Sequence, residues 1–254
     1  MGRSKFVLPM LVGCLLGAGG YAIVEYRLTE WTTGNQLDPA FRYVEDRRDF
    51  PNALLIGDSI SIGYTPVVQE ALRQQFDVFR IPANAENSET LLRNVDRWLS
   101  HRKWDVIHFN VGLHDLRRDK TPDGQPWASP EQYERNLRAI VARLKQTGAT
   151  LIFATTTPVP AEARGRNEGE ERIYNEVAIK VMCEADIPIN DLAHQPLVQF
   201  YQLPNNVHFG PEGSAVLGLY VAQAIQHHTR PETSAEVLID KSVTPHTPAE
   251  CRHR

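Results

Sequence analysis

Short apolar segments alternate with amphipathic segments along most of the chain, and this alternation constrains the fold more than any other feature. Strands are expected at about 53–56, 78–81, 106–110, 151–154 and 187–190, and helices at about 66–75, 90–99, 130–144, 171–184 and 211–227. Strands that alternate with helices build a parallel sheet with helices on both faces. The sequence therefore predicts an α/β domain over residues 51–228, with helices on both faces of a five-stranded parallel sheet.

The two ends of the chain differ from this pattern. Arg3 and Lys5 precede an apolar run over residues 6–24, which indicates an export segment. This run could be a cleaved signal peptide, a retained membrane anchor, or a segment that carries a lipid on Cys14. Each alternative places the domain outside the cytoplasm. Residues 25–50 are predicted to be a connector, and the polar, proline-containing residues 229–254 a disordered tail.

Composition excludes several classes of protein. The chain holds 27 Lys and Arg against 31 Asp and Glu, and no basic stretch indicates a nucleic-acid groove. Its three cysteines have no spacing typical of a disulfide framework or a metal site, and Cys183 is expected to be a small buried apolar residue. We expect no metal and no cofactor. The sequence does not determine the oligomeric state.

Three polar positions are predicted to meet at one edge of the sheet. Ser59 follows the first expected strand, His114 follows the third, and His208 precedes the last helix. Ligand sites of open parallel sheets lie beyond the carboxyl ends of the strands. A serine hydroxyl is a weak nucleophile that needs an adjacent base, and histidine suits that role. Taken singly, each position has an ordinary explanation as a turn or capping residue.

Three short motifs resemble the blocks of the GDSL/SGNH hydrolase family. They are Gly57-Asp58-Ser59, Gly112-Leu113-His114-Asp115 and Asn205-Asn206-Val207-His208, and the resemblance spans roughly residues 52 to 228. The resemblance implies a flavodoxin-like, three-layer α/β/α SGNH hydrolase fold. It also implies a serine esterase of the kind found among bacterial extracytoplasmic carbohydrate esterases.

The resemblance assigns roles to individual residues. Ser59 would be the nucleophile and His208 the general base, with Asn205 at the position of the family's triad aspartate. The oxyanion hole would consist of the Ser59 N–H, Ser88 and His114. Asp58 and Asp115 would support the surrounding loops.

Three of these positions depart from the family pattern. His114 stands where the family has an oxyanion asparagine, although an imidazole can still donate a hydrogen bond. Asn205 stands where the family has an aspartate, and an asparagine cannot balance an imidazolium. Either another acceptor, such as a backbone carbonyl, orients His208, or the enzyme works as a dyad. Ser88 stands where a glycine N–H is expected. These changes keep a non-catalytic carbohydrate-binding protein open as an alternative function.

The expected substrate is a small acyl ester, with O-acetyl on a carbohydrate as the leading possibility. Two loops, 116–128 and 158–169, flank the predicted site. Trp127 could stack on a sugar ring, although loops of this kind are usually just solvated. The arginines of the two loops could meet an acidic glycan; they are Arg117, Arg118, Arg164 and Arg166. No long apolar loop indicates an acyl-chain tunnel. A thioesterase or lysophospholipase remains a further alternative.

Overall fold

The computed structural model describes residues 13–14, 22–23 and 38–229, which fall into two units. In the first unit, β1 (Gly13–Cys14) pairs antiparallel with β2 (Ala22–Ile23). The predicted export segment and the predicted disordered tail lie almost wholly outside the described residues. Within the described ranges, no helix combines the length and the apolar character needed to cross a membrane.

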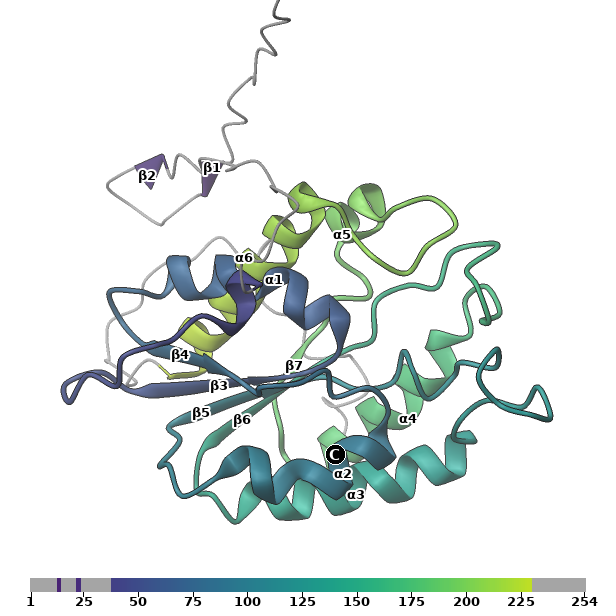
Figure 1. Ribbon diagram of the computed structural model, residues 1–254, viewed down its shortest axis with the longest axis horizontal. Helices are drawn as coiled ribbons and strands as arrows, with labels where there is room; N and C mark the ends of the chain where they lie inside the picture. The colour runs from purple at the N-terminus through teal and green to yellow at the C-terminus, as the bar shows by residue number, and fades with distance from the viewer. Residues whose placement is uncertain (1–12, 15–21, 24–37, 230–254) are drawn as a thin grey trace, which may run out of the picture. The chain divides into compact units, whose positions relative to one another are not determined.

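The second unit is built on a five-stranded sheet, as predicted. Its strands are β3 (Asn52–Ile56), β4 (Asp77–Arg80), β5 (Val106–Phe109), β6 (Thr150–Ala154) and β7 (Ile189–Asn190). They lie in the order β4-β3-β5-β6-β7 and every pair is parallel (Figure 1). The chain steps from β3 to one edge and then returns past β3 to β5. That order is the flavodoxin-like one, with its switch point between β3 and β5.

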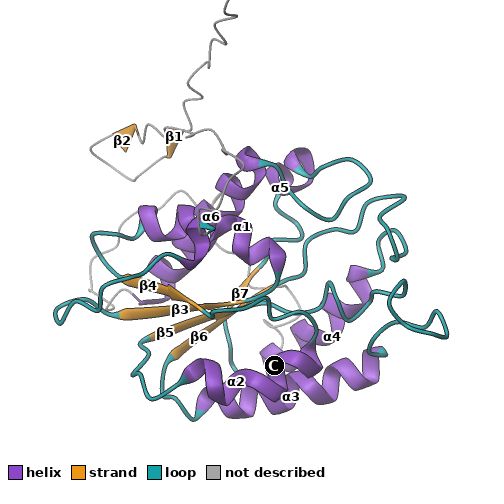
Figure 2. Ribbon diagram, viewed as in Figure 1, coloured by secondary structure: helices purple, strands orange, loops and turns teal. Residues whose placement is uncertain are grey.

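Helices cover both faces of this sheet, which confirms the predicted three layers. The helical segments are η1 (Pro39–Phe41), α1 (Ser59–Ala71), α2 (Ser88–Leu99), α3 (Pro130–Lys145), α4 (Glu171–Glu184), α5 (Pro196–Tyr201) and α6 (Pro211–Thr229). Helices α1 and α6 lie on one face, and α2, α3 and α4 lie on the other (Figure 2).

The core lies between these layers and explains the apolar segments of the sequence. Residues 53–56 of β3 and 106–109 of β5 are buried, because both faces of the sheet are covered. Helices α1 and α6 approach closely at Gly218, where an added Cβ would lie 2.6 Å from Val67 Cβ. A glycine at this position therefore sets the distance between the two helices.

The structure corrects the predicted start of the first helix. Helix α1 begins at Ser59 rather than near Pro66, which lies inside it. The Asp58 carboxylate accepts a hydrogen bond from the Ile60 N–H at 2.9 Å and caps the helix. The capping residue therefore determines the helix start, and the proline is accommodated within the helix. Helix α5 was not predicted, and β7 is two residues shorter than expected.

The expectation for Cys183 is wrong. The residue is disulfide-bonded and only partly buried, so it is not a plain buried thiol in the core. Farther toward the N-terminus, residues 38–50 of the predicted connector contact the domain. Ala40 is buried, and Arg47 Nε pairs with the buried Asp77 carboxylate at 2.6 Å.

Candidate active site

Ser59 and His208 meet at the carboxyl edge of the sheet, although 149 residues separate them in the sequence. Ser59 is the first residue of α1, directly after β3, and His208 lies in the loop before α6. Ser59 Oγ lies 2.9 Å from His208 Nε2, which is hydrogen-bond distance. The pair has the geometry of a nucleophile beside its base.

Asn206, not Asn205, contacts the histidine ring. Asn206 Oδ1 lies 2.8 Å from His208 Nδ1 and 3.1 Å from the His208 backbone N. An amide oxygen only accepts, so His208 Nδ1 carries the proton and Nε2 is free to accept the Ser59 hydroxyl proton. The sequence left open which group orients His208, with Asn205 at the position of the family's triad aspartate, and the structure places Asn206 at the ring instead. Asn205 instead adopts a left-handed backbone (φ 56°), which turns the chain so that Asn206 reaches back to His208.

The backbone around Ser59 is shaped by its neighbours. A Cβ at Gly57 would lie 2.8 Å from Ser61 Cβ, so glycine permits the close turn between β3 and α1. The Ser59 N–H belongs to the first turn of α1, where backbone N–H groups have no partner within the helix. This N–H and the positive end of the helix can stabilise an anion beside Ser59.

Arg80, at the end of β4, binds the turn between β3 and α1. Its Nη2 donates to the carbonyl oxygens of Gly57 and Asp58, each at 3.1 Å, and to Ser61 Oγ at 2.8 Å. Its Nη1 donates to the carbonyl oxygens of residues 81 and 83 at 2.9 and 2.6 Å. Burial lowers the pKa of Arg80 to about 10, and the group remains charged at neutral pH. Arg80 therefore ties the nucleophile turn to the segment that follows β4.

His114 lies on the loop after β5, as predicted. It is partly buried, and its side chain forms no hydrogen bond with another described residue. Burial lowers the His114 pKa, with Arg166 and Arg117 acting in the same direction and Asp58 opposing them. The imidazole is therefore neutral at neutral pH and keeps one N–H to donate. Gly112 makes the loop possible, because a Cβ there would lie 2.4 Å from Thr156 Oγ1.

The structure contradicts the predicted oxyanion role of Ser88. Its backbone N–H donates to both Asp115 carboxylate oxygens, at 3.0 and 3.1 Å, and its hydroxyl donates to the same carboxylate. Asn136 Nδ2 in turn donates to Ser88 Oγ at 2.8 Å. The Ser88 N–H therefore has an acceptor already. Asp115 braces the loop after β5 against the start of α2, and burial raises the Asp115 pKa to about 7.

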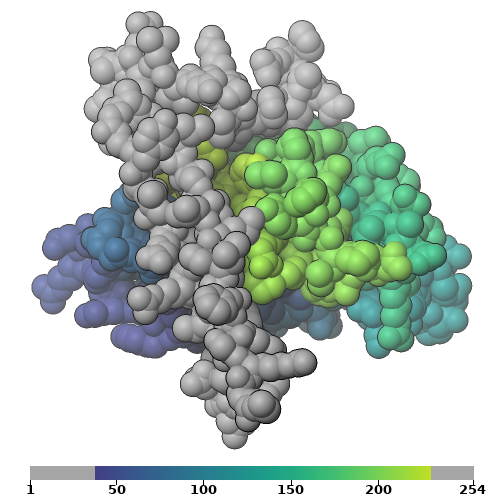
Figure 3. Space-filling view, turned by 90° about the horizontal axis from the view of Figure 1, so that it is seen from above, coloured from purple at the N-terminus to yellow at the C-terminus, as the bar shows by residue number. Residues whose placement is uncertain are grey.

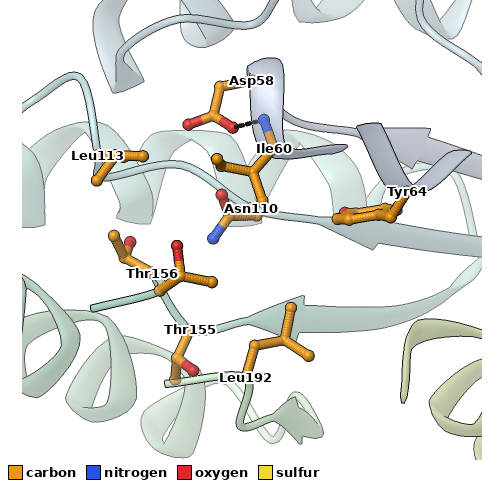
Figure 4. Close-up of a pocket in the computed structure, with 9 residues that line it drawn as sticks. Asp58, Ile60, Tyr64, Asn110, Leu113, Thr155, Thr156 and Leu192 are labelled. Atoms are coloured by element: carbon orange, nitrogen blue, oxygen red, sulfur yellow. Dashed lines mark hydrogen bonds between the residues drawn. The ribbon is translucent and has the colours of Figure 1, made fainter. Parts of the chain in front are cut away.

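A small pocket opens at the same edge of the sheet (Figure 4). Its lining residues follow β3, β5, β6 and β7, and they are Asp58, Ile60, Tyr64, Asn110, Leu113, Thr155, Thr156, Thr157 and Leu192. Asp58 Oδ2, Tyr64 Oη and Thr157 Oγ1 are buried here without a hydrogen-bond partner among the described residues. The Asn110 amide is occupied, since its Nδ2 donates to the Ala154 carbonyl at 2.7 Å. The pocket is small, and both polar and apolar residues line it.

The two predicted rim residues lie side by side. The Trp127 backbone N–H donates to the Arg117 carbonyl at 3.0 Å, and the Trp127 side chain is 45% exposed. The Arg117 guanidinium forms an ion pair with Asp119, so its charge is already compensated. Trp127 is therefore available for stacking, whereas Arg117 is less available for an acidic ligand than the sequence suggests.

Three exposed apolar side chains precede the His208 loop in the chain. Leu197, Phe200 and Leu203 are 48%, 77% and 38% exposed. They lie on α5 and the loop after it, which forms part of the surface seen in Figure 3. The Leu203 backbone N–H donates to the His208 carbonyl at 3.0 Å, so Leu203 lies beside the His208 loop.

Two residues of the site were missed from the sequence. Asn206 could have been found from the spacing Asn-x-His, which is typical of an asparagine that accepts the N–H two residues on. Arg80 had no local signal, because its acceptors are mainly backbone carbonyls brought together by folding. Among the described residues, no cluster of three or more His, Cys, Asp or Glu side chains could hold a metal ion.

Known proteins share this fold. The model of the GDSL-like Lipase/Acylhydrolase family matches residues 55–216, which is more than half of the chain. No curated protein sequence matches the chain.

Three solved structures illustrate the likeness. The lipase/acylhydrolase from Enterococcus faecalis has 17% identity and a TM-score of 0.61, over 73% of this chain and 100% of that one. The acetyl xylan esterase AlAXEase has 16% identity and a TM-score of 0.59, over 68% and 99%. Axe2, an acetylxylan esterase from Geobacillus stearothermophilus, has 18% identity and a TM-score of 0.58, over 69% and 94%. These likenesses show the shared fold. The match to the family model shows that this chain belongs to the GDSL-like lipase/acylhydrolase family and is a carboxylic ester hydrolase.

Proposed function

We propose that this protein is a serine esterase that removes small acyl groups, chiefly acetyl, from a carbohydrate through an acyl-enzyme on Ser59. The observation that carries the proposal is the 2.9 Å contact between Ser59 Oγ and His208 Nε2. A base at this distance can take the hydroxyl proton as the oxygen attacks an ester carbonyl.

The proposed reaction has two halves. In the first, Ser59 Oγ bonds to the ester carbon, His208 takes the proton, and the Ser59 N–H and the neutral His114 donate to the oxyanion. His208 then protonates the leaving alcohol as the ester C–O bond breaks. In the second, water attacks the acyl-enzyme with His208 as base, and Ser59 regains its proton as the acid leaves. Asn206 orients His208 throughout but cannot balance the charge of the imidazolium.

The pocket supports a small acyl group. The pocket is too small to take a long alkyl chain. Structural neighbours described as acetyl xylan esterases, and the exposed Trp127 ring, support a carbohydrate as the alcohol.

A second candidate is a thioesterase or lysophospholipase. The exposed side chains of Leu197, Phe200 and Leu203 favour it, because a group of exposed apolar side chains can hold an alkyl chain. In that case the alkyl chain would lie along α5, outside the small pocket.

We also propose an extracytoplasmic location. It is supported by the basic and apolar residues at positions 1–24, and by the disulfide bond at Cys183, since disulfides persist mainly in oxidising compartments.

Acyl selectivity separates the two candidate functions. We expect kcat/KM for p-nitrophenyl esters to fall at least about tenfold from acetyl to octanoyl, and acetylated xylan to release acetate. Each methylene group that a pocket accommodates is worth about 1–3 kcal/mol, so a site for a longer chain would instead raise kcat/KM with chain length. A rise with chain length, abolished in Phe200→Ser, would support the lipid candidate and contradict the acetyl esterase.

A further inference from the structure

The two loops beside His114 form one connected surface. The Arg118 N–H donates to the Gly165 carbonyl at 2.8 Å, and the Arg118 guanidinium pairs with Glu170. Arg164 Nε pairs with Asp119 at 3.2 Å. Gly165 has φ +68°, and a Cβ there would lie 2.5 Å from Asp119 Oδ1. This close contact holds the 163–170 segment against the loop after β5.

Arg166 differs from the other arginines of this surface. Arg117, Arg118 and Arg164 each pair with a carboxylate. Arg166 instead donates from Nε to the Leu113 carbonyl at 2.8 Å and from Nη1 to the Arg164 carbonyl at 3.2 Å. It forms no ion pair with any residue of the described chain. Its cation is therefore fixed in place by carbonyl groups and has no carboxylate partner.

The position of Arg166 is next to the proposed oxyanion donor. The carbonyl that holds it belongs to Leu113, which lines the pocket and precedes His114. Arg166 also acts electrostatically on His114 and on Asp58, the residue before Ser59. A ligand group on Arg166 would therefore lie close to an ester held at Ser59.

A partly buried guanidinium without a counter-ion destabilises the folded protein, and a bound anion would offset this cost. Burial, followed by repulsion from Arg117, lowers the Arg166 pKa to about 10. The planar guanidinium is suited to a carboxylate, which it can bind through two parallel hydrogen bonds.

We propose that Arg166 binds a carboxylate of the carbohydrate that carries the ester, so that the substrate is an acylated acidic polysaccharide. This inference rests on the proposed function and specifies the alcohol side of its substrate.

The test compares one acidic and one neutral polymer. We expect the wild-type protein to have a higher kcat/KM on O-acetylated polygalacturonate than on O-acetylated xylan. In Arg166→Gln this ratio should fall about 10- to 100-fold, mainly through KM, and Arg166→Lys should retain part of it. Arg138→Gln removes the same charge from α3, where Arg138 pairs with Glu134 and Glu184, and should keep the wild-type ratio.

Binding without turnover separates this inference from the proposed function. Ser59→Ala should bind de-esterified polygalacturonate in calorimetry, more weakly at higher salt, and Ser59→Ala with Arg166→Gln should not. If the wild type hydrolyses no ester while this binding persists, the proposed function fails and the anion site stands. If Arg166→Gln lowers activity on both polymers equally, or leaves their ratio unchanged, the anion site is wrong even though the esterase stands. Thermal unfolding of each variant shows whether it is folded.

Discussion

Asn206 is the residue at which this site differs most from a triad with an acid. Its Oδ1 lies 2.8 Å from His208 Nδ1, so it fixes the tautomer that leaves Nε2 free. An amide supplies no negative charge to the imidazolium that forms as Ser59 attacks. The structure therefore combines a well-oriented base with incomplete electrostatic support.

Substitutions at Asn206 test whether it orients His208 without supplying a charge. Asn206→Leu should lower kcat by about 100-fold or more, because His208 loses its orienting acceptor. Asn206→Asp keeps an acceptor and adds a charge, so kcat should rise by about tenfold. Steady-state kinetics with p-nitrophenyl acetate measure both effects. Asn205→Gly, which suits the left-handed backbone there, is the control and should stay close to wild type. Equal activity in Asn206→Leu and wild type would remove Asn206 from the site.

Asp115 links protonation to stability. Burial raises its folded pKa to about 7, above its ordinary value of 3.8. A carboxyl whose folded pKa is raised contributes stability below the unfolded pKa and loses it as pH rises through the folded pKa. Relative to Asp115→Asn, the wild type should lose on the order of a few kcal/mol between pH 4 and pH 7. Urea unfolding across this range measures the difference, and a constant difference between the two proteins would contradict the raised pKa.

Some residues of the site could be predicted from the sequence and others could not. Ser59 and His208 could be predicted, because strand ends and helix starts place them at the same edge of the sheet. The family's Asp-x-x-His block pointed to Asn205, whereas the Asn-x-His spacing of Asn206 was overlooked, and the positive φ at Asn205 is what brings Asn206 to the ring. Ser88 was assigned wrongly because its hydrogen bonds to Asp115 join segments 27 residues apart.

Among the elements, α1 and α6 determine how Ser59 and His208 come together. Helix α1 carries Ser59 at its start, and α6 follows the loop that carries His208. The two helices pack against each other on the same face of the sheet (Figure 2). Their close approach at Gly218 helps to fix the distance between nucleophile and base.

Two glycines at this helix pair should respond in opposite ways to alanine. At Gly218 a Cβ would lie 2.6 Å from Val67 Cβ and 3.1 Å from the Tyr64 carbonyl, so Gly218→Ala should destabilise the fold by about 1–3 kcal/mol. At Gly63 a Cβ would lie 3.0 Å from Ser214 Oγ, which can rotate away. Gly63→Ala should therefore be neutral, or stabilising by up to about 1 kcal/mol from helix propensity. Urea unfolding of both variants measures this, and equal destabilisation would contradict the packing described.

Most helices and strands could be predicted because buried positions carry apolar residues at the spacing of a helix or a strand. The strands are short and apolar since both faces of the sheet are covered, and α4 has the predicted bounds of 171–184. Helix α5 escaped prediction because it has only 6 residues and exposes Leu197 and Phe200. Its polar and apolar residues do not follow a buried face.

At the scale of the whole molecule, the strand order explains why the site forms where it does. Every strand of the five-stranded sheet points the same way, so the loops after β3, β5 and β6 share one edge (Figure 1). Ser59, His114 and the pocket threonines reach that edge from different parts of the chain. The motifs predicted this convergence, and the sequence already offered the arginines of the rim loops for an acidic glycan, whereas Arg80 became visible only through backbone carbonyls that folding brings together.

The pairing of Ser59 with His208 is most directly tested by hydrolysis of p-nitrophenyl acetate. The wild-type protein should release p-nitrophenol, and Ser59→Ala and His208→Ala should each lower kcat by at least about 1,000-fold. The double variant should be no slower than either single one, because the two residues act as a unit. Turnover by Ser59→Ala equal to wild type would contradict the acyl-enzyme on Ser59, and so would His208→Ala with undiminished kcat.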